Sequence, residues 1–146
     1  MNSNAESPET NSPIRILTVV LVDDQLFIRE VVRRMLLEQP DIDYHYFTDS
    51  SEAIRRIKEI QPDVILQDLV IPGVDGIELV RYYRAQEVTR STRVILLSSS
   101  GDADTRGRAF AAGVDEFMVK PPSKAALLGS IRFLTGSSGK TEKIAR

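Results

Sequence analysis

Four apolar runs in the sequence each end in a side chain that can do polar chemistry. They lead to Asp68, to the adjacent pair Asp23 and Asp24, to Ser98 and to Lys120. If these runs are parallel strands, their carboxyl ends meet at one edge of the sheet, where open α/β sheets place their ligands. The sequence therefore predicts one site that holds three carboxylates, a hydroxyl and an ammonium.

Three carboxylates at one sheet edge repel each other, so a raised pKa or a bound cation must offset their charge. Mg²⁺ prefers octahedral ligation by oxygen atoms, from a few carboxylates, waters and phosphate groups. Because Asp23 and Asp24 are adjacent at a strand end, we expect one to ligate directly and the other through water. Phosphoryl transfer needs mainly positioning and charge neutralisation. The five side chains suit an aspartate that accepts a phosphoryl group beside Mg²⁺.

Each of these residues also has a purely structural explanation. Asp24 would cap the first helix while Asp23 is solvated, Lys120 would be a solvated lysine at a strand end, and Ser98 would begin a serine loop. The bond from Lys120 to Pro121 is a candidate cis peptide, which would fix the direction of the lysine side chain. The occurrence of all five residues at strand ends favours the functional explanation.

The elements that must position these residues follow a regular alternation. Strand-length apolar runs alternate with segments of helical period, which indicates βαβ units and a parallel sheet. We expect strands at Ile16–Val22, Tyr44–Phe47, Val64–Asp68, Val94–Ser98 and Glu116–Val119. We expect helices at Leu26–Glu38, Ser51–Gln61, Ile77–Gln86, Thr105–Ala112 and Ser123–Leu134. The more polar second strand suits the sheet edge, because strands covered on both faces are almost uninterruptedly apolar.

Composition excludes several classes of function. The chain is 42% apolar and 27% charged with a net charge of −2, which predicts no attraction to nucleic acid or to an anionic membrane. It has no cysteine, so disulfides and thiolate chemistry are excluded. No run approaches the roughly 18 apolar residues of a membrane span, and the N-terminus has no apolar signal region. We therefore expect a cytoplasmic protein.

The expected organisation is a single domain between two polar tails. A chain of 146 residues is long enough for one domain with a real core. Residues 1–13 are rich in Asn, Ser, Glu and Pro and read as a disordered N-terminal tail. Residues 135–146 read as a flexible C-terminal tail. The domain itself would then span residues 14–134.

The order and spacing of these motifs resemble the receiver domain of bacterial two-component response regulators. The resemblance covers about residues 14–134 and rests on the acid pair at Asp23 and Asp24, on the run from Gln67 to Gly76, on Ser98, and on Val119-Lys120-Pro121. It implies a doubly wound, flavodoxin-like α/β fold with five helices and strand order 2-1-3-4-5. The segment 64–76 is especially similar to receivers that precede diguanylate cyclase domains. Since the sequence contains no such domain, we expect a stand-alone receiver without that activity.

The resemblance implies a phosphoacceptor with a bound Mg²⁺. Asp68 would accept the phosphoryl group from a phosphohistidine of a sensor histidine kinase or a histidine phosphotransfer protein. Asp24, Asp68 and the backbone carbonyl of Val70 would bind Mg²⁺ directly, and Asp23 would bind it through water. The lifetime of the phosphoryl group stays open, because Val70 is apolar where polar residues often occur, and Ser100 is small where longer polar residues are frequent.

The resemblance also implies a switch. Ser98 would be the hydroxyl that moves, Lys120 the phosphate-binding lysine, and Phe117 the aromatic side chain whose rotamer follows the hydroxyl. The surface of the fourth and fifth helices with the last strand would then select a downstream protein. Asp115, Glu116 and Arg132 are candidates for pairing across a homodimer, and Arg106 on the fourth helix is expected to face solvent.

Three alternatives remain. The chain could be a constitutive receiver-like interaction module, or the N-terminal part of a longer response regulator. It could also be an aspartate-nucleophile phosphohydrolase, but those resembling the haloacid dehalogenase group carry Asp-x-Asp on the first strand. Here Asp23 and Asp24 are adjacent and the candidate nucleophile Asp68 follows the third strand. We therefore expect no enzyme acting on an external substrate, only self-catalysed phosphotransfer and dephosphorylation.

Overall fold

The computed structural model describes residues 15–136, and the predicted tails lie almost entirely outside them. Its strands are β1 (Leu17–Val22), β2 (Ile42–Phe47), β3 (Val64–Asp68), β4 (Val70–Ile71), β5 (Val74–Asp75), β6 (Arg93–Ser98) and β7 (Glu116–Val119). Its helices are α2 (Leu26–Leu37), α3 (Ser50–Ile60), α4 (Gly76–Ala85), α5 (Ala103–Ala112) and α6 (Lys124–Thr135). Every predicted strand and helix is present. Helix α6 includes Thr135, which we had placed in the C-terminal tail.

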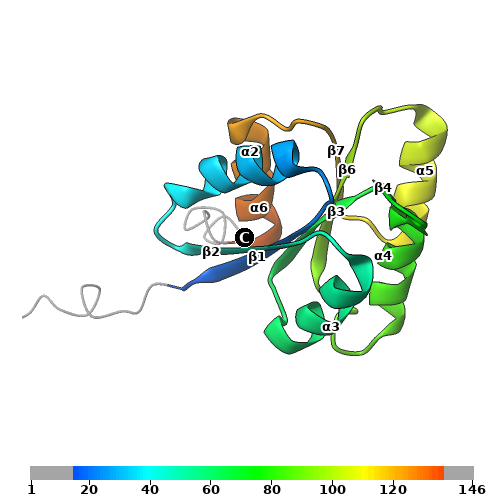
Figure 1. The fold of residues 1–146 in the computed structure, drawn as a ribbon, viewed down its shortest axis with the longest axis horizontal. Coiled ribbons are helices and arrows are strands. Elements are labelled where there is room, and N and C mark those ends of the chain that lie inside the picture. Colours follow the sequence, from blue (N-terminus) through cyan, green and yellow to red (C-terminus); the bar gives the residue numbers. More distant parts are fainter. Residues whose placement is uncertain (1–14, 137–146) are drawn as a thin grey trace, which may run out of the picture.

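The five long strands form one parallel sheet in the order β2-β1-β3-β6-β7. Counted along the chain, this is the predicted order 2-1-3-4-5. Helices α2 and α6 cover one face of the sheet, and α3, α4 and α5 cover the other (Figure 1). The polar strand β2 lies at the edge, as its composition predicts. The doubly wound α/β fold is therefore confirmed.

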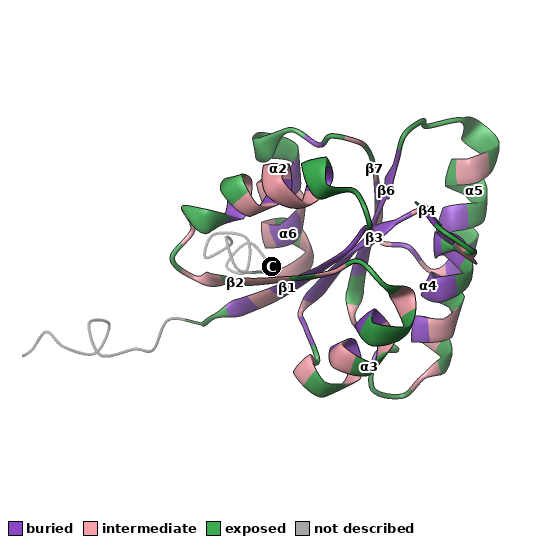
Figure 2. Cartoon of the chain, viewed as in Figure 1, coloured by how far each residue is buried: buried purple, intermediate pink, exposed green. Residues whose placement is uncertain are grey.

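Successive side chains of the central strands point to opposite faces of the sheet, so the core is divided into two layers. In β1, Val19 and Leu21 pack on the α2 and α6 side, whereas Val20 and Val22 pack on the side of α3, α4 and α5. Both faces of the strand are therefore apolar, as expected when helices cover a parallel sheet on both sides. Figure 2 shows the central strands buried and the outer faces of the helices exposed.

Within residues 15–136, a short hairpin after β3 is the one element that we did not predict from the sequence. Strands β4 and β5 are antiparallel, and Gly73 between them has a φ of +76°, a conformation that favours glycine. The hairpin returns the chain so that the Gly76 N–H donates to the backbone oxygen of Leu69 at 2.7 Å. A Cβ on Gly76 would lie only 2.1 Å from the backbone oxygen of Asp68. Helix α4 thus begins directly against the end of β3.

Local capping explains where α3 begins and where α5 begins and ends. Asp49 accepts a hydrogen bond from the Glu52 N–H at 2.9 Å, which starts α3 at the predicted cap. Gly113 has a φ of +109° and ends α5, as predicted. Asp102 caps the start of α5 through the Thr105 N–H at 2.8 Å, two residues earlier than expected.

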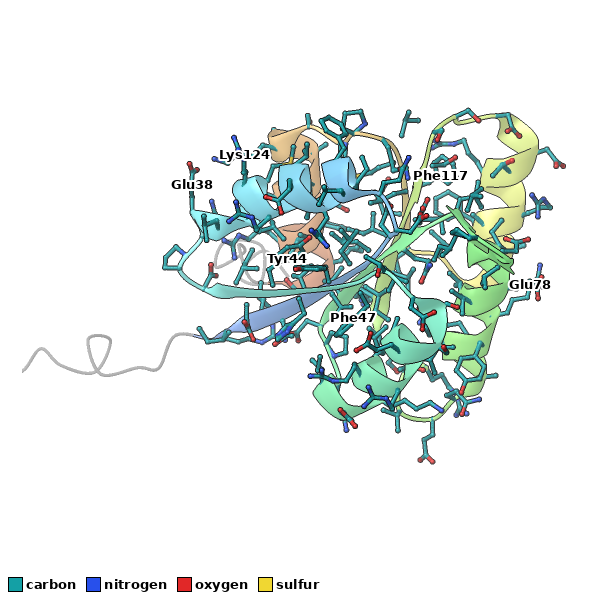
Figure 3. The ribbon with its side chains drawn as sticks, viewed as in Figure 1. Glu38, Tyr44, Phe47, Glu78, Phe117 and Lys124 are labelled. Carbon is teal, nitrogen blue, oxygen red and sulfur yellow. The ribbon has the colours of Figure 1, made fainter. Side chains whose placement is uncertain are left out.

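Ion pairs join helices to each other and to loops within the chain. Glu38 and Lys124 join the end of α2 to the start of α6 and point toward each other in Figure 3. Arg132 on α6 pairs with Asp41 at 2.6 Å, and Asp115 pairs with Arg84 at 3.0 Å. Arg132 and Asp115, two of the candidates for pairing across a homodimer, thus have ion-pair partners within the chain. The homodimer stays a prediction.

Candidate functional site

The sheet brings the predicted residues together at one edge. Asp23 follows β1, Asp68 ends β3, Ser98 ends β6 and Lys120 follows β7, and these strands are neighbours in the sheet. A cleft at this edge is lined by Asp24, Gln25, Asp68, Leu69, Val70, Pro72, Ser98, Ser99, Ser100 and Lys120. The structure therefore brings the acids, the hydroxyl and the ammonium together at one edge of the sheet, and their roles there stay a prediction.

The three carboxylates form a compact cluster. One oxygen from each of Asp23, Asp24 and Asp68 lies within 4.8 Å of the others. Asp23 and Asp68 are almost fully buried, whereas Asp24 is exposed. The N-cap of α2 is Gln25, so Asp24 does not cap that helix, and Asp23 instead accepts the Gln25 N–H at 2.8 Å. Neither acid has the structural role that we considered as an alternative.

The ammonium of Lys120 lies among the carboxylates. Its Nζ is 3.0 Å from Asp68 Oδ1 and 3.2 Å from Asp23 Oδ2, and its side chain is only 7% exposed. It also donates to Gln25 Oε1 at 2.5 Å. The Lys120–Pro121 peptide is cis, as predicted. Lys120 is thus not a solvated lysine at a strand end.

Charge at the site is not balanced by one lysine. Burial raises the pKa of Asp68 to about 6, and the negative charge of Asp23 adds to this, while Lys120 lowers it. The Val70 N–H also donates to Asp68 Oδ1, at 3.3 Å. A cluster of carboxylate oxygens with an excess of negative charge supplies the kind of donor atoms that Mg²⁺ prefers. Asp23, Asp24 and Asp68 could therefore hold a divalent cation.

The hydroxyl and the aromatic residue lie on neighbouring strands beside the cluster. Ser98 Oγ donates to the backbone oxygen of Ser100 at 2.6 Å, so it points into its own loop. Phe117, labelled in Figure 3, is 3% exposed. The Arg106 guanidinium lies 4.7 Å from the centre of its ring, in a cation–π contact. We had expected Arg106 only to face solvent; it is exposed, but it also covers Phe117.

Two further polar residues at the site were missed. Gln67, fully buried in β3, donates through Nε2 to the backbone oxygen of Asp68 at 3.1 Å, and its Oε1 accepts from the Tyr83 hydroxyl at 2.6 Å. A glutamine inside an apolar strand needs buried partners, and that signal was present in the sequence. Gln25 directly follows the acid pair. Its partner Lys120 is 95 residues away in the sequence, so no local pattern predicts their contact.

Comparisons with known proteins identify the class. Residues 19–132 match the family model of the response regulator receiver domain. The chain belongs to this family, whose receiver domains are phosphoacceptors of two-component systems. None of the helices between residues 15 and 136 is long and apolar enough to cross a membrane.

Two relatives show how far the similarity extends. A protein-glutamate methylesterase/protein-glutamine glutaminase of Methanospirillum hungatei is 39% identical over 109 residues, which are 73% of this chain and 31% of that protein. The transcriptional regulatory protein ResD of Bacillus subtilis is 33% identical over 123 residues, 84% of this chain and 50% of that protein. The chain thus spans half or less of the length of these two relatives.

Solved receiver domains have the same fold over most of the chain. The receiver domain of the sensor histidine kinase PA1611 from Pseudomonas aeruginosa superimposes with a TM-score of 0.75 at 27% identity, covering 84% of this chain and 98% of that one. That structure has a magnesium ion coordinated in its active site cleft. The response regulator domain of Thermotoga maritima CheB gives a TM-score of 0.73 at 29% identity, with coverages of 84% and 98%.

Proposed function

We propose that this protein is a phosphorylation-dependent switch in which Asp68 accepts a phosphoryl group from a phosphohistidine. The donor would be a sensor histidine kinase or a histidine phosphotransfer protein. The observation that carries the proposal is the placement of Asp68, almost fully buried, with Lys120 Nζ at 3.0 Å and two more carboxylates within 4.8 Å. A buried acid with one ammonium and a cation-binding cluster beside it suits transfer of a phosphoryl group.

In the transfer step, a carboxylate oxygen of Asp68 attacks the phosphorus and forms the new P–O bond. The P–N bond to the donor imidazole breaks, and its electron pair returns to the ring nitrogen. Lys120 stays within hydrogen-bonding distance and offsets the charge on the phosphoryl oxygens. Mg²⁺, held directly by Asp24, Asp68 and the Val70 carbonyl and through water by Asp23, would supply further charge neutralisation when bound.

The switch would act through Ser98 and Phe117. Ser98 Oγ donates to Ser100 in this structure, so it must turn from its own loop to donate to a phosphoryl oxygen. Phe117 is already buried, and the Arg106 guanidinium lies over it. A change in the Phe117 ring would therefore displace Arg106 and with it the surface of α5, β7 and α6. We infer that this surface selects a downstream protein, through a two-state shift biased by the new charge.

The alternatives differ in how they use the site. A constitutive interaction module would not need all five side chains, and their convergence in one cleft supports the phosphorylated switch instead. Whether the receiver works alone or as the N-terminal part of a longer response regulator stays a prediction, as do the link to diguanylate cyclases and a cytoplasmic location.

The test is incubation of the wild type and Asp68→Asn with acetyl phosphate and Mg²⁺, followed by intact mass measurement. The wild type should gain one phosphate and Asp68→Asn should gain none. Asp43→Asn, which removes an exposed aspartate at the sheet edge, is the matched control and should behave as the wild type does. A wild type that gains no phosphate and does not bind beryllofluoride would favour the constitutive module.

A further inference from the structure

Gln25 is placed at the site by an unusual arrangement at the start of α2. It occupies the N-cap position of that helix, with extended backbone angles, φ −88° and ψ 118°. A polar N-cap side chain ordinarily accepts a hydrogen bond from the first turn. Within the described residues, Gln25 makes no such capping bond. Its side chain reaches instead across the cleft, where Oε1 accepts from Lys120 Nζ at 2.5 Å.

The ammonium of Lys120 therefore has as many acceptors as it has protons. Two of the three acceptors are carboxylate oxygens, of Asp68 at 3.0 Å and of Asp23 at 3.2 Å. The third, from Gln25, is neutral. The two carboxylates are the groups that a phosphoryl group and a cation would occupy. When their oxygens are taken up, Gln25 is the acceptor that stays available to Lys120.

We propose that Gln25 is a positioning residue for phosphotransfer, because its amide oxygen holds the Lys120 ammonium over Asp68 while the carboxylates change partners. This inference rests on the proposed function of Asp68 as the phosphoacceptor. A neutral acceptor suits this role, since it orients the ammonium without competing with the phosphoryl group for its charge. Gln25 does not touch the reacting atoms itself and acts through Lys120.

Two variants separate the acceptor from the shape of the side chain. Gln25→Met keeps the length of the side chain but removes the oxygen, and Gln25→Glu keeps an oxygen at the same place. Neither removes a cap from α2, because that helix starts through the backbone oxygen of Gln25, which accepts from the Arg29 N–H at 3.1 Å. Unchanged thermal unfolding of both variants would show that the fold is intact.

The first readout is the ¹⁵N NMR signal of the lysine ammonium groups in protein free of Mg²⁺ and phosphate, with Lys120 assigned by its loss in Lys120→Arg. Gln25→Met should speed hydrogen exchange of the Lys120 ammonium about tenfold. A tenfold change corresponds to about 1.4 kcal/mol, which is near the lower end of the net free energy of a hydrogen bond to a charged group. Gln25→Glu should restore the slow exchange. Equal exchange in wild type and Gln25→Met would overturn the inference.

The second readout is the rate of phosphorylation by acetyl phosphate with Mg²⁺. Gln25→Met should lower the rate at saturating donor about tenfold and leave the donor concentration for half-maximal rate unchanged. If the wild type is phosphorylated and Gln25→Met is equally fast, the role of Gln25 is overturned and the proposed function stands. If the wild type takes up no phosphate, the proposed function is overturned, whatever the ammonium exchange shows about Gln25.

Discussion

Lys120 Nζ lies 3.0 Å from Asp68 Oδ1 across 52 residues of sequence, and the two side chains are only 7% and 3% exposed. The same ammonium contacts Asp23, which is fully buried. Lys120 is therefore the positive charge that allows two buried carboxylates to lie side by side. Because a buried charge without a partner is costly, the stability of the site depends on this lysine.

Replacing Lys120 with methionine should destabilise the protein when Mg²⁺ is absent. The change leaves Asp23 and Asp68 buried without their cation, and we expect a loss of about 3 kcal/mol in the free energy of unfolding at pH 7.5. Urea unfolding with a chelator present measures it. Lys124→Met, which breaks the exposed pair with Glu38, is the control and should change stability little. Equal stability of the two variants would contradict the account.

The stability of the metal-free protein should depend on the ionisation of Asp68. Burial and the charge of Asp23 raise the pKa of Asp68 to about 6, above its value in the unfolded chain. Ionisation therefore costs more in the folded state, and stability should fall as the pH rises from about 4 to about 6 and stay lower above that range. The size of the effect is at most about 3 kcal/mol.

Asp68→Asn removes this ionisation and therefore tests whether stability falls, rather than rises, with increasing pH. The variant should be more stable than the wild type at pH 7.5 and about as stable at pH 4, as measured by thermal unfolding over that pH range with a chelator. Asp104→Asn is the control for loss of a surface carboxylate, since the side chain of Asp104 is 87% exposed. A wild type that gains stability as the pH rises from 4 to 6, relative to Asp68→Asn, would show that the sign is wrong.

Gly76→Ala should damage both the fold and the site. The new Cβ would lie 2.1 Å from the backbone oxygen of Asp68 and 2.8 Å from Leu69 Cα, and backbone atoms cannot move aside cheaply. We expect a loss of roughly 2–3 kcal/mol of stability and slower phosphorylation. In Gly107→Ala, in α5, the new Cβ has no atom within 4 Å. This variant should raise the free energy of unfolding by about 0.5–1 kcal/mol. Urea unfolding of the pair would refute the steric account if both variants gained stability.

Tyr83→Phe should weaken the support beneath Asp68. Gln67 is fully buried and would lose the hydroxyl that Tyr83 donates to its Oε1 at 2.6 Å. An unsatisfied buried acceptor costs about 1–3 kcal/mol. Tyr82→Phe removes a hydroxyl that only accepts from the Lys58 ammonium in a half-buried position, and it should cost less. Chemical unfolding ranks the two, and the reverse order would exclude the role given to Gln67.

The sequence predicted what depends on local pattern. Strands β1, β3 and β6 are apolar on both faces, and Gly113 and Asp49 mark helix ends, so the alternation of strands and helices and the place of the acids at strand ends followed from local pattern. The strand order came from the resemblance to receiver domains and did not follow from that pattern. The hairpin of β4 and β5 was missed because strands of two residues leave no period to detect. The contacts of Gln25 and Arg106 were missed because they join side chains from distant elements, and only the packed structure defines them.

The central claim is that Asp68 itself carries the phosphoryl group. Borohydride reduction converts an aspartyl phosphate into homoserine, and peptide mass spectrometry then locates it in the chain. After treatment with acetyl phosphate and Mg²⁺, we predict homoserine at position 68 and at no other aspartate. Homoserine at Asp23 or Asp24, or at no position in a protein that does gain phosphate, would contradict the account.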